Sequence, residues 1–244
     1  MQGSSGMLQA ELPFRNSDIF VVIPAYNEHK ILGQTVADVA SHGYSIVVVD
    51  DGSPIPERDC LLGSPSSNVW YVRHVSNLGA GAAIQTGTEF ALQQGAEIIV
   101  HFDADGQHIP ALIADVISPI RRGECDIVLG SRFLNSADRA LVPRRKQILL
   151  KLGVFVSWLF TGVWLSDTHN GFRALSRTAA QRIRMTENGY AHCTELLGLI
   201  RQSKLPYIEL PTTIRYTTYS MAKGQSILNS VNIVLDLVLN KFFG

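Results

Sequence analysis

The stretch Glu97-Ile-Ile-Val-His-Phe-Asp-Ala-Asp-Gly-Gln-His108 decides how the rest of the sequence is interpreted. It begins as an apolar run typical of a strand. Two aspartates, Asp103 and Asp105, follow this run with one residue between them. Side chains at i and i+2 of an extended chain point to the same side, so both carboxylates are expected to face one site. Carboxylate oxygens suit hard divalent cations. The stretch therefore predicts a cation site that suits a diphosphate ligand.

Two simpler explanations of this stretch compete with the cation site. The aspartates could be solvated turn residues with no ligand. An EF-hand loop is a poor match, because such a loop ends in a glutamate at its twelfth position, and that position is Ala114. The cation site remains the preferred interpretation because other segments of the chain point to the same place.

Composition sets the broad class of the protein. The chain has 244 residues, of which 46% are hydrophobic and 17% charged, and its formal net charge is zero. A neutral chain of this kind argues against strong nonspecific binding to nucleic acid. Cys60, Cys125 and Cys193 show neither a zinc spacing nor a disulfide pattern, which fits a reducing cytosol. The polar N-terminus predicts no signal peptide.

Strand and helix patterns alternate over the first two-thirds of the chain. Short apolar runs predict strands at 19–23, 45–49, 69–72, 98–100 and 126–129. Apolar residues at helical spacing predict helices between them, around Leu32, Val36 and Val39, around Ile84, Thr88 and Ala91, and from Leu112 to Ile120. This alternation predicts a mostly parallel sheet covered by helices, which binds ligands beyond the carboxyl ends of its strands.

Polar residues follow the predicted strands at those ends: Asp51, Asn77, Asp103 and Arg132. The glycine-rich stretch 77–83 opens a predicted helix, so its backbone N–H groups are expected to face an anion. It does not complete the dinucleotide pattern Gly-x-Gly-x-x-Gly, because Ile84 holds the last position. A redox dinucleotide enzyme is therefore weakly supported.

The last third of the chain is more apolar. Residues 149–165 carry two tryptophans but are shorter than the roughly 20 residues that span a bilayer. They predict a helix that is either buried or rests on an anionic membrane through the basic cluster 144–146. The tail 227–243 predicts an amphipathic helix, and residues 1–6 are expected to be a remnant added for expression.

Six motifs occur together in a fixed order. They are Pro24-Ala-Tyr-Asn-Glu28, Asp50-Asp-Gly-Ser53, Asn77-Leu-Gly-Ala-Gly81, Asp103-Ala-Asp-Gly-Gln-His108, Gly130-Ser-Arg132 and Asp167-Thr-His-Asn-Gly-Phe-Arg173. With this set the chain resembles family 2 glycosyltransferases. The similarity is greatest to the branch of dolichyl-phosphate mannose synthase and the bacterial polyprenyl-phosphate sugar transferases. It implies an α/β GT-A fold, a Rossmann-like and mostly parallel sheet flanked by helices. The expected domain is 7–226, with a C-terminal amphipathic helix at 227–244.

The resemblance also implies roles for individual residues. Contact with the nucleotide is implied for Pro24, Tyr26, Glu28, Asp51, Gly79, Asp103 and Ala104. Binding of Mg²⁺ or Mn²⁺ is implied for Asp103, Asp105 and Gln107. Places near the acceptor or the phosphates are implied for Arg132, Asp167, Arg173, Arg215 and Lys223. Catalytic roles are assigned to Asp105, Arg132, Arg173 and Glu195.

The acceptor is left open between a polyprenyl phosphate and a sugar hydroxyl. A hydroxyl needs a general base, and Glu195 is the acid available for that, unless it is only a first-turn helix acid. An ionised phosphate needs no base, which favours the lipid phosphate. The segment 215–226 departs from the Gly-x-Ser-Lys pattern of the synthase branch, and this keeps a saccharide acceptor in competition.

The expected activity is inverting, metal-dependent sugar transfer from a UDP- or GDP-linked donor at the cytosolic membrane face in cell-envelope glycan synthesis, with homodimerisation left open. Two other classes were considered. A sugar-1-phosphate nucleotidyltransferase is disfavoured because 24–28 is not a glycine-rich loop with basic residues. A noncatalytic nucleotide-sugar-binding domain is disfavoured by the intact Asp103, Asp105, Arg132 and Arg173.

Overall fold

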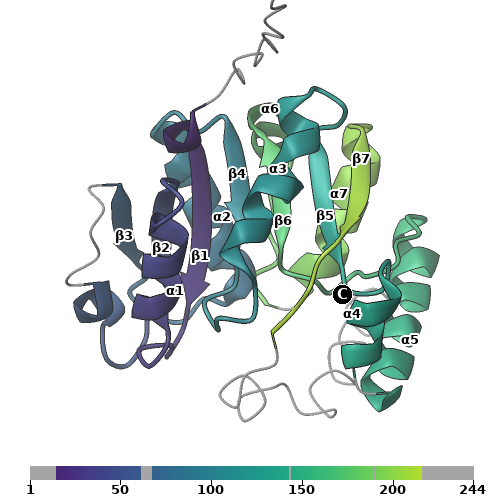
Figure 1. The fold of residues 1–244 in the computed structure, drawn as a ribbon, viewed down its shortest axis with the longest axis horizontal. Helices are drawn as coiled ribbons and strands as arrows, with labels where there is room; N and C mark the ends of the chain where they lie inside the picture. Colours follow the sequence, from purple (N-terminus) through teal and green to yellow (C-terminus); the bar gives the residue numbers. More distant parts are fainter. Residues whose placement is uncertain (1–14, 62–67, 143, 190, 216–244) are drawn as a thin grey trace, which may run out of the picture.

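The computed structural model of the chain describes residues 15–61, 68–142, 144–189 and 191–215. Its centre is a seven-stranded sheet (Figure 1). The strands are β1 (Ile19–Ala25), β2 (Ser45–Asp50), β3 (Val69–Arg73), β4 (Ile98–His101), β5 (Ile127–Ser131), β6 (Arg173–Ser176) and β7 (Tyr207–Pro211). Their order is β3-β2-β1-β4-β6-β5-β7, and β6 is antiparallel to both of its neighbours.

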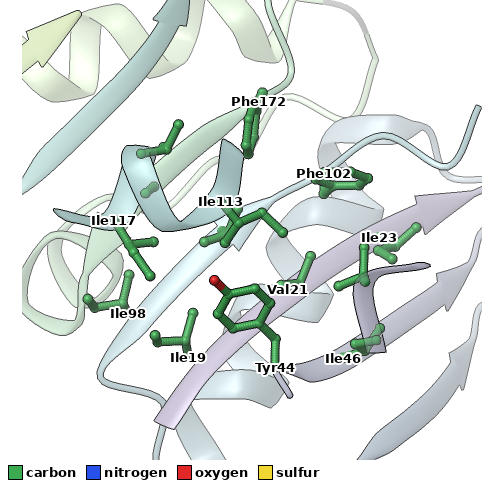
Figure 2. Packing of buried hydrophobic residues seen from close by; sticks show 14 of the residues in the cluster. Ile19, Val21, Ile23, Tyr44, Ile46, Ile98, Phe102, Ile113, Ile117 and Phe172 are labelled. Atoms are coloured by element: carbon green, nitrogen blue, oxygen red, sulfur yellow. The ribbon is translucent and has the colours of Figure 1, made fainter. Parts of the chain in front are cut away.

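Helices cover both faces of the sheet (Figure 1). They are α1 (Leu32–Ala40), α2 (Ala80–Gln93), α3 (Ile113–Arg121), α4 (Ser136–Leu141), α5 (Arg144–Thr161), α6 (Arg177–Arg182) and α7 (His192–Ser203), with short 3₁₀ turns η1 (Asn16–Asp18), η2 (Glu57–Leu61) and η3 (Pro110–Leu112). Alternate residues of β1 point to opposite faces, so Val21 joins a core with α1 and α3, whereas Val22 joins a core with α2, α6 and α7. Figure 2 shows the first of these cores.

The structure confirms the mostly parallel sheet and the strands and helices predicted for the first two-thirds. The strands β6 and β7 were not anticipated. Strand β6 is only four residues long, Arg-Ala-Leu-Ser, and it gains its stability from pairing with β4 on one side and β5 on the other. Strand β7 lies at the edge of the sheet and has no fully buried residue. Neither carries the long apolar run that marks a buried strand.

The direction of β6 matters for the site. The parallel strands β1, β2, β4 and β5 end at one edge of the sheet, and β6 begins at that edge because it runs the opposite way. Arg173, the first residue of β6, pairs with His101, the last residue of β4. Arg173 therefore lies at the same edge as Asp103, although the two are far apart in sequence.

Helix α5 lies beside the sheet and packs against α7 (Figure 1). One side of it is buried, including Val154 and Ser157. Large apolar side chains on the other side are exposed: Ile148, Leu152, Phe155, Trp158 and Leu159. In the described part of the chain, no helix combines the length and apolarity needed to cross a membrane. The remnant 1–6, Lys223 and the helix predicted for 227–244 lie outside the described residues.

Candidate active site

Asp103 stands just beyond β4 at the carboxyl edge of the sheet. His108 donates from Nε2 to Asp103 Oδ2 at 2.9 Å. The ring of His108 is fixed between Phe102 and Phe172, with ring centroids 5.4 and 5.1 Å away. Burial would raise the pKa of Asp103, but the charge and hydrogen bond of His108 lower it below its ordinary value. The Asp103 side chain is 45% exposed, so it is an ionised carboxylate available to a ligand.

Gly171 makes room for Asp103. A Cβ atom on Gly171 would lie 2.4 Å from Asp103 Oδ1, closer than a side chain can tolerate. The Asn-Gly-Phe motif therefore supports the aspartate directly: Gly171 leaves the space, and Phe172 packs on the histidine that orients the carboxylate. This explains why the motif stands near the Asp103–Asp105 loop, although the two are separated along the chain.

Asp105 is held by a different neighbour. The backbone N–H of Gln107 donates to Asp105 Oδ1 at 3.0 Å, and its side-chain Nε2 donates to Asp105 Oδ2 at 2.5 Å. Burial and the nearby charge of Asp103 raise the pKa of Asp105. The two carboxylates therefore repel each other across a common space, and a cation placed there would relieve that repulsion.

The donor set fits Mg²⁺ or Mn²⁺. Both ions prefer oxygen ligands, and Mg²⁺ at phosphate sites is typically held by one or two carboxylates, with the remaining positions filled by water and phosphate oxygens. Among the described residues, no group of three or more His, Cys, Asp or Glu side chains could hold a metal. A site made by Asp103 and Asp105 would therefore depend on the diphosphate for further ligands.

Arg215 reaches the same loop. Its backbone N–H donates to the carbonyl oxygen of Gln107 at 2.8 Å, and the preceding residue, Ile214, forms an antiparallel bridge with His108. The Arg215 side chain is exposed. The structure thus brings the predicted phosphate-site arginine next to the predicted metal site.

Asp51 is more deeply engaged within the protein than the sequence indicates. It is 3% exposed. Its carboxylate accepts hydrogen bonds from Leu78 N at 2.9 Å, Gly79 N at 2.8 Å and His74 Nδ1 at 2.7 Å. The role of Asp51 in holding the start of α2 was not predicted, and neither was His74.

For three residues of the glycine-rich stretch, Leu78, Gly79 and Gly81, the bonds correct the expectation that the N–H groups face a bound anion. The N–H groups of Leu78 and Gly79 are bonded to Asp51, and the N–H of Gly81 donates to the carbonyl of Asn188 at 2.8 Å. The anion at this helix start is the protein's own carboxylate. Gly79 is needed there because it has a φ of +109°, which favours glycine.

The loops after β1 and β2 are held by two acidic residues, Glu57 and Asp50, to which the sequence analysis gave no role. Glu57 is fully buried, and its Oε1 accepts from the backbone N–H of Glu28 at 2.6 Å. Burial raises the pKa of Glu57. Asp50 accepts from Ser53 N at 2.9 Å and from Arg73 Nε at 3.1 Å. The only signal for Asp50 was its place beside Asp51.

The other predicted nucleotide contacts lie around this loop. The pairing of β1 with β4 ends at Val22 and His101, before Pro24. Because proline has no backbone N–H, this position lets it stand in β1 without the loss of a hydrogen bond to β4. Tyr26 is 44% exposed. Ala104 is buried between the two aspartates, and its carbonyl accepts from Thr35 Oγ1 at 3.1 Å.

Arg132 and Asp167 form a buried pair. Arg132 Nε and Nη2 donate to the two carboxylate oxygens of Asp167 at 2.6 and 2.7 Å. Burial would raise the pKa of Asp167, but Arg132 lowers it. Both residues are at least nine-tenths buried. This geometry gives the pair a structural task in joining the end of β5 to the segment before β6.

Arg173 is also buried, at 3% exposure, but it is only partly satisfied. Its Nε donates to the Asn170 carbonyl at 3.0 Å, and Nη2 lies 3.3 Å from Cys193 Sγ. Its Nη1 has no hydrogen-bond partner among the described residues. A buried guanidinium with an unused donor is suited to binding an anionic oxygen.

Glu195 is placed as a structural anchor. Its two oxygens accept from Thr186 N, Thr186 Oγ1 and Glu187 N at 2.6–3.0 Å. It lies in the first turn of α7, where a negative charge is favoured by the helix dipole. Of the two roles considered for it, the geometry favours the first-turn helix acid over the general base.

A mostly parallel sheet with an Asp-x-Asp loop at its carboxyl edge defines a GT-A nucleotide-diphospho-sugar transferase fold. The sequence profile of glycosyl transferase family 2 matches residues 20–184, so the chain belongs to this family, as its motifs indicated, and is a glycosyltransferase.

Named relatives lie in the predicted branch. The UDP-N-acetylglucosamine–dolichyl-phosphate N-acetylglucosaminyltransferase of Methanococcus voltae is 34% identical over 241 residues, covering 91% of this chain and 96% of the relative. The polyprenol monophosphomannose synthase of Mycolicibacterium smegmatis is 29% identical over 211 residues, covering 83% of this chain and 79% of the relative.

A solved structure confirms the fold at greater distance. Glucosyl-3-phosphoglycerate synthase from Mycobacterium tuberculosis, solved with Mn²⁺, UDP and glucosyl-3-phosphoglycerate, is 18% identical to this chain and superposes with a TM-score of 0.57. The match covers 91% of this chain and 78% of that chain.

Proposed function

We propose that the protein transfers a sugar from a nucleotide-diphosphate donor to a polyprenyl phosphate at a membrane surface, with inversion at the sugar carbon. One observation carries the proposal: the exposed Asp103 carboxylate, Asp105 and the Arg215 backbone meet in one loop, in a chain 34% identical to a dolichyl-phosphate N-acetylglucosaminyltransferase. The loop supplies a site for the diphosphate, and the relative indicates the class of acceptor.

On the donor side, Asp103 and Asp105 would hold Mg²⁺ or Mn²⁺ against the diphosphate. When bound, such a cation stabilises the negative charge that develops on the leaving diphosphate. The residues of the chain orient this site: His108 aligns Asp103, Gln107 aligns Asp105, and Arg215 brings a positive charge to the same loop.

On the acceptor side, the contacts of Glu195 favour a phosphate. Transfer to a sugar hydroxyl requires a group that removes a proton. Glu195 is engaged with residues 186–187, whereas an ionised phosphate needs no such base. Arg173, whose Nη1 has no hydrogen-bond partner among residues 15–61, 68–142, 144–189 and 191–215, would then bind a phosphate oxygen of the acceptor.

Helix α5 supplies a means of reaching a lipid acceptor. Ile148, Leu152, Phe155 and Leu159 recur at spacings of four, three and four residues, so they line one side of the helix, and all four are exposed. Trp158 and Trp164 are exposed near its C-terminal end. Tryptophan is enriched at membrane interfaces. We call the five exposed apolar residues of α5 together with Trp164 the α5 apolar face.

Charge supports an anionic membrane as the partner of this face. Residues 136–161 contain five basic residues and one acidic residue, although the whole chain is neutral. An exposed apolar stripe with a basic helix start is the pattern of an interfacial helix. All three cysteines are free, which fits the cytosolic side of the membrane.

The proposal is tested by a transfer assay. The purified chain is incubated with labelled UDP-N-acetylglucosamine, UDP-glucose or GDP-mannose, with Mn²⁺ and with either dolichyl or undecaprenyl phosphate in vesicles. We expect label from one donor to enter the organic phase as a lipid-phosphate sugar. Label that enters only added saccharides would contradict the phosphate acceptor, and nucleotide binding without any transfer would favour a noncatalytic domain.

A further inference from the structure

Cys193 lies in a cationic environment at the acceptor side of the site. Its Sγ is 3.3 Å from Arg173 Nη2 and 3.5 Å from His192 Nε2. It stands in the first turn of α7, where the helix dipole favours a negative charge. The residue as a whole is partly exposed.

His192 is oriented to accept the thiol proton. Its Nδ1 donates to the Gly189 carbonyl at 2.7 Å, which leaves Nε2 facing Cys193. An imidazole held by a third group and directed at a thiol is the arrangement that activates a cysteine. Arg173, which is permanently charged, adds a second positive group on the thiol.

The electrostatics agree with this geometry. Burial alone would raise the pKa of the Cys193 thiol, but His192, Arg173 and, to a smaller extent, His169 lower it to about 5. Burial would lower the pKa of His192, but Cys193 raises it above its ordinary value. In contrast, burial raises the pKa of both Cys60 and Cys125.

We propose that Cys193 is a modification site: with Arg173 and His192 in contact with its sulfur, it is alkylated or oxidised selectively among the cysteines of the chain. With hydrogen peroxide as the oxidant, the sulfur attacks one peroxide oxygen, an S–O bond forms and the O–O bond breaks. Sulfur loses two electrons, and hydroxide leaves and takes a proton to become water. The product is a sulfenic acid, which a thiol reductant reverses.

Arg173 gives the oxidised form a further partner. Its Nη1, which has no hydrogen-bond partner in the described part of the chain, belongs to the same buried guanidinium that contacts Sγ. An oxygen added to the sulfur would compete for that guanidinium. On the basis of the proposed function, where Arg173 binds the acceptor phosphate, oxidation would block sugar transfer while leaving nucleotide binding at Asp103 and Asp105 intact.

The pH dependence of alkylation tests the proposal without any knowledge of the substrates. The folded protein is treated with iodoacetamide between pH 6 and 8, and the rate at each cysteine is read by peptide mass spectrometry. The rate follows the thiolate fraction, so an ordinary thiol speeds up by roughly 80-fold over this range. We expect Cys193 to change by less than about twofold, with Cys60 as the steep internal reference.

The alkylation rates distinguish an activated Cys193 from an ordinary thiol. A Cys193 rate that rises as steeply as that of Cys60 would overturn the proposal, and so would a Cys193 that reacts only in urea. The variant His192→Gln is first shown to have the same melting curve as the unmodified protein. We then expect it to be alkylated at Cys193 at least about fivefold more slowly at pH 6, with a rate that rises with pH. An unchanged flat profile in that variant would refute the pairing with His192.

Activity gives a separate second readout. Peroxide treatment is expected to abolish transfer to the lipid phosphate, to leave UDP or GDP binding unchanged, and to be reversed by dithiothreitol. Because alkylation is measured on the protein itself, a failure of the proposed function would show as absent transfer before treatment and would leave the Cys193 test intact.

Discussion

Asp103 and Asp105 are one residue apart, yet each is oriented by a separate partner. His108 aligns Asp103, and Gln107 aligns Asp105. The sequence predicted that the two carboxylates face one site, because the spacing alone implies it. It did not predict Gly171 as the residue that leaves space for Asp103, since that contact joins two loops far apart in the chain.

Replacement of Gly171 by alanine should weaken nucleotide binding more than folding. The added Cβ would lie 2.4 Å from Asp103 Oδ1 and would displace the carboxylate from its place beside His108. We expect a loss of at least about tenfold in the affinity for a metal–nucleotide complex, measured by calorimetry. Gly198→Ala is the control, because a Cβ there meets nothing within 4 Å. Equal affinity in both variants would show that Gly171 does not position Asp103.

Asp51 should matter for stability as well as for ligand binding. Asp51→Ala leaves the N–H groups of Leu78 and Gly79 and the ring of His74 without their acceptor. Each buried group left unpaired costs about 1–3 kcal/mol, so we expect the free energy of unfolding in urea to fall by about 3 kcal/mol. A variant that keeps full stability and loses only nucleotide affinity would show that these bonds contribute little to the fold.

At the level of elements, prediction succeeded where local pattern and final environment agree. The apolar stripes of α1, α2 and α3 are buried as their spacing implies. Strand β6 was not predicted, because its four residues are stabilised by pairing with two neighbouring strands. Such pairing cannot be seen in the local sequence. The expectation for the residues before α2 failed for the same reason: the N–H groups of Leu78 and Gly79 donate to Asp51, which comes from another loop.

The two sides of helix α5 differ in exposure. Its pattern fitted either a core helix or an interfacial one, and the structure shows one buried side and one exposed apolar side. Leu152 and Leu159, at 51% and 65% exposure, lie in the middle of the exposed side. An exposed apolar side is what the structure shows, and contact of this side with a membrane is a proposal.

The double variant Leu152→Gln, Leu159→Gln should bind less to anionic vesicles. Loss of two apolar side chains from a membrane interface is expected to reduce partitioning by at least about tenfold in a flotation assay with phosphatidylglycerol vesicles. Ile55→Gln with Val75→Gln is the matched control, because both residues are at least as exposed but lie outside α5. Unchanged vesicle binding together with loss of a dimer in light scattering would instead identify the α5 apolar face as a contact between two copies.

At the level of the whole molecule, the order of motifs was the strongest signal. It predicted the family and the sheet, because the first five motifs end a strand, follow one or lead into a helix at the carboxyl edge, and the sixth leads into β6 at the same edge. The sequence could not show which charged residues are already paired. Arg132 is bonded to Asp167, and Glu195 is bonded to residues 186–187, whereas Nη1 of Arg173 has no hydrogen-bond partner in the described part of the chain. These distinctions arise from long-range contacts, which a sequence pattern does not show.

The account rests on the binding of a metal–diphosphate by Asp103 and Asp105, and a calorimetric titration tests it most directly. UDP and GDP are titrated into the protein with Mn²⁺ or with EDTA, alongside Asp105→Asn and the control Asp115→Asn, an exposed residue on α3. We predict that one of the two nucleotides binds in the presence of Mn²⁺. Its affinity should fall at least about tenfold with EDTA or in Asp105→Asn, and should be unchanged in Asp115→Asn. Equal binding with Mn²⁺ and EDTA, or full affinity in Asp105→Asn, would contradict the account.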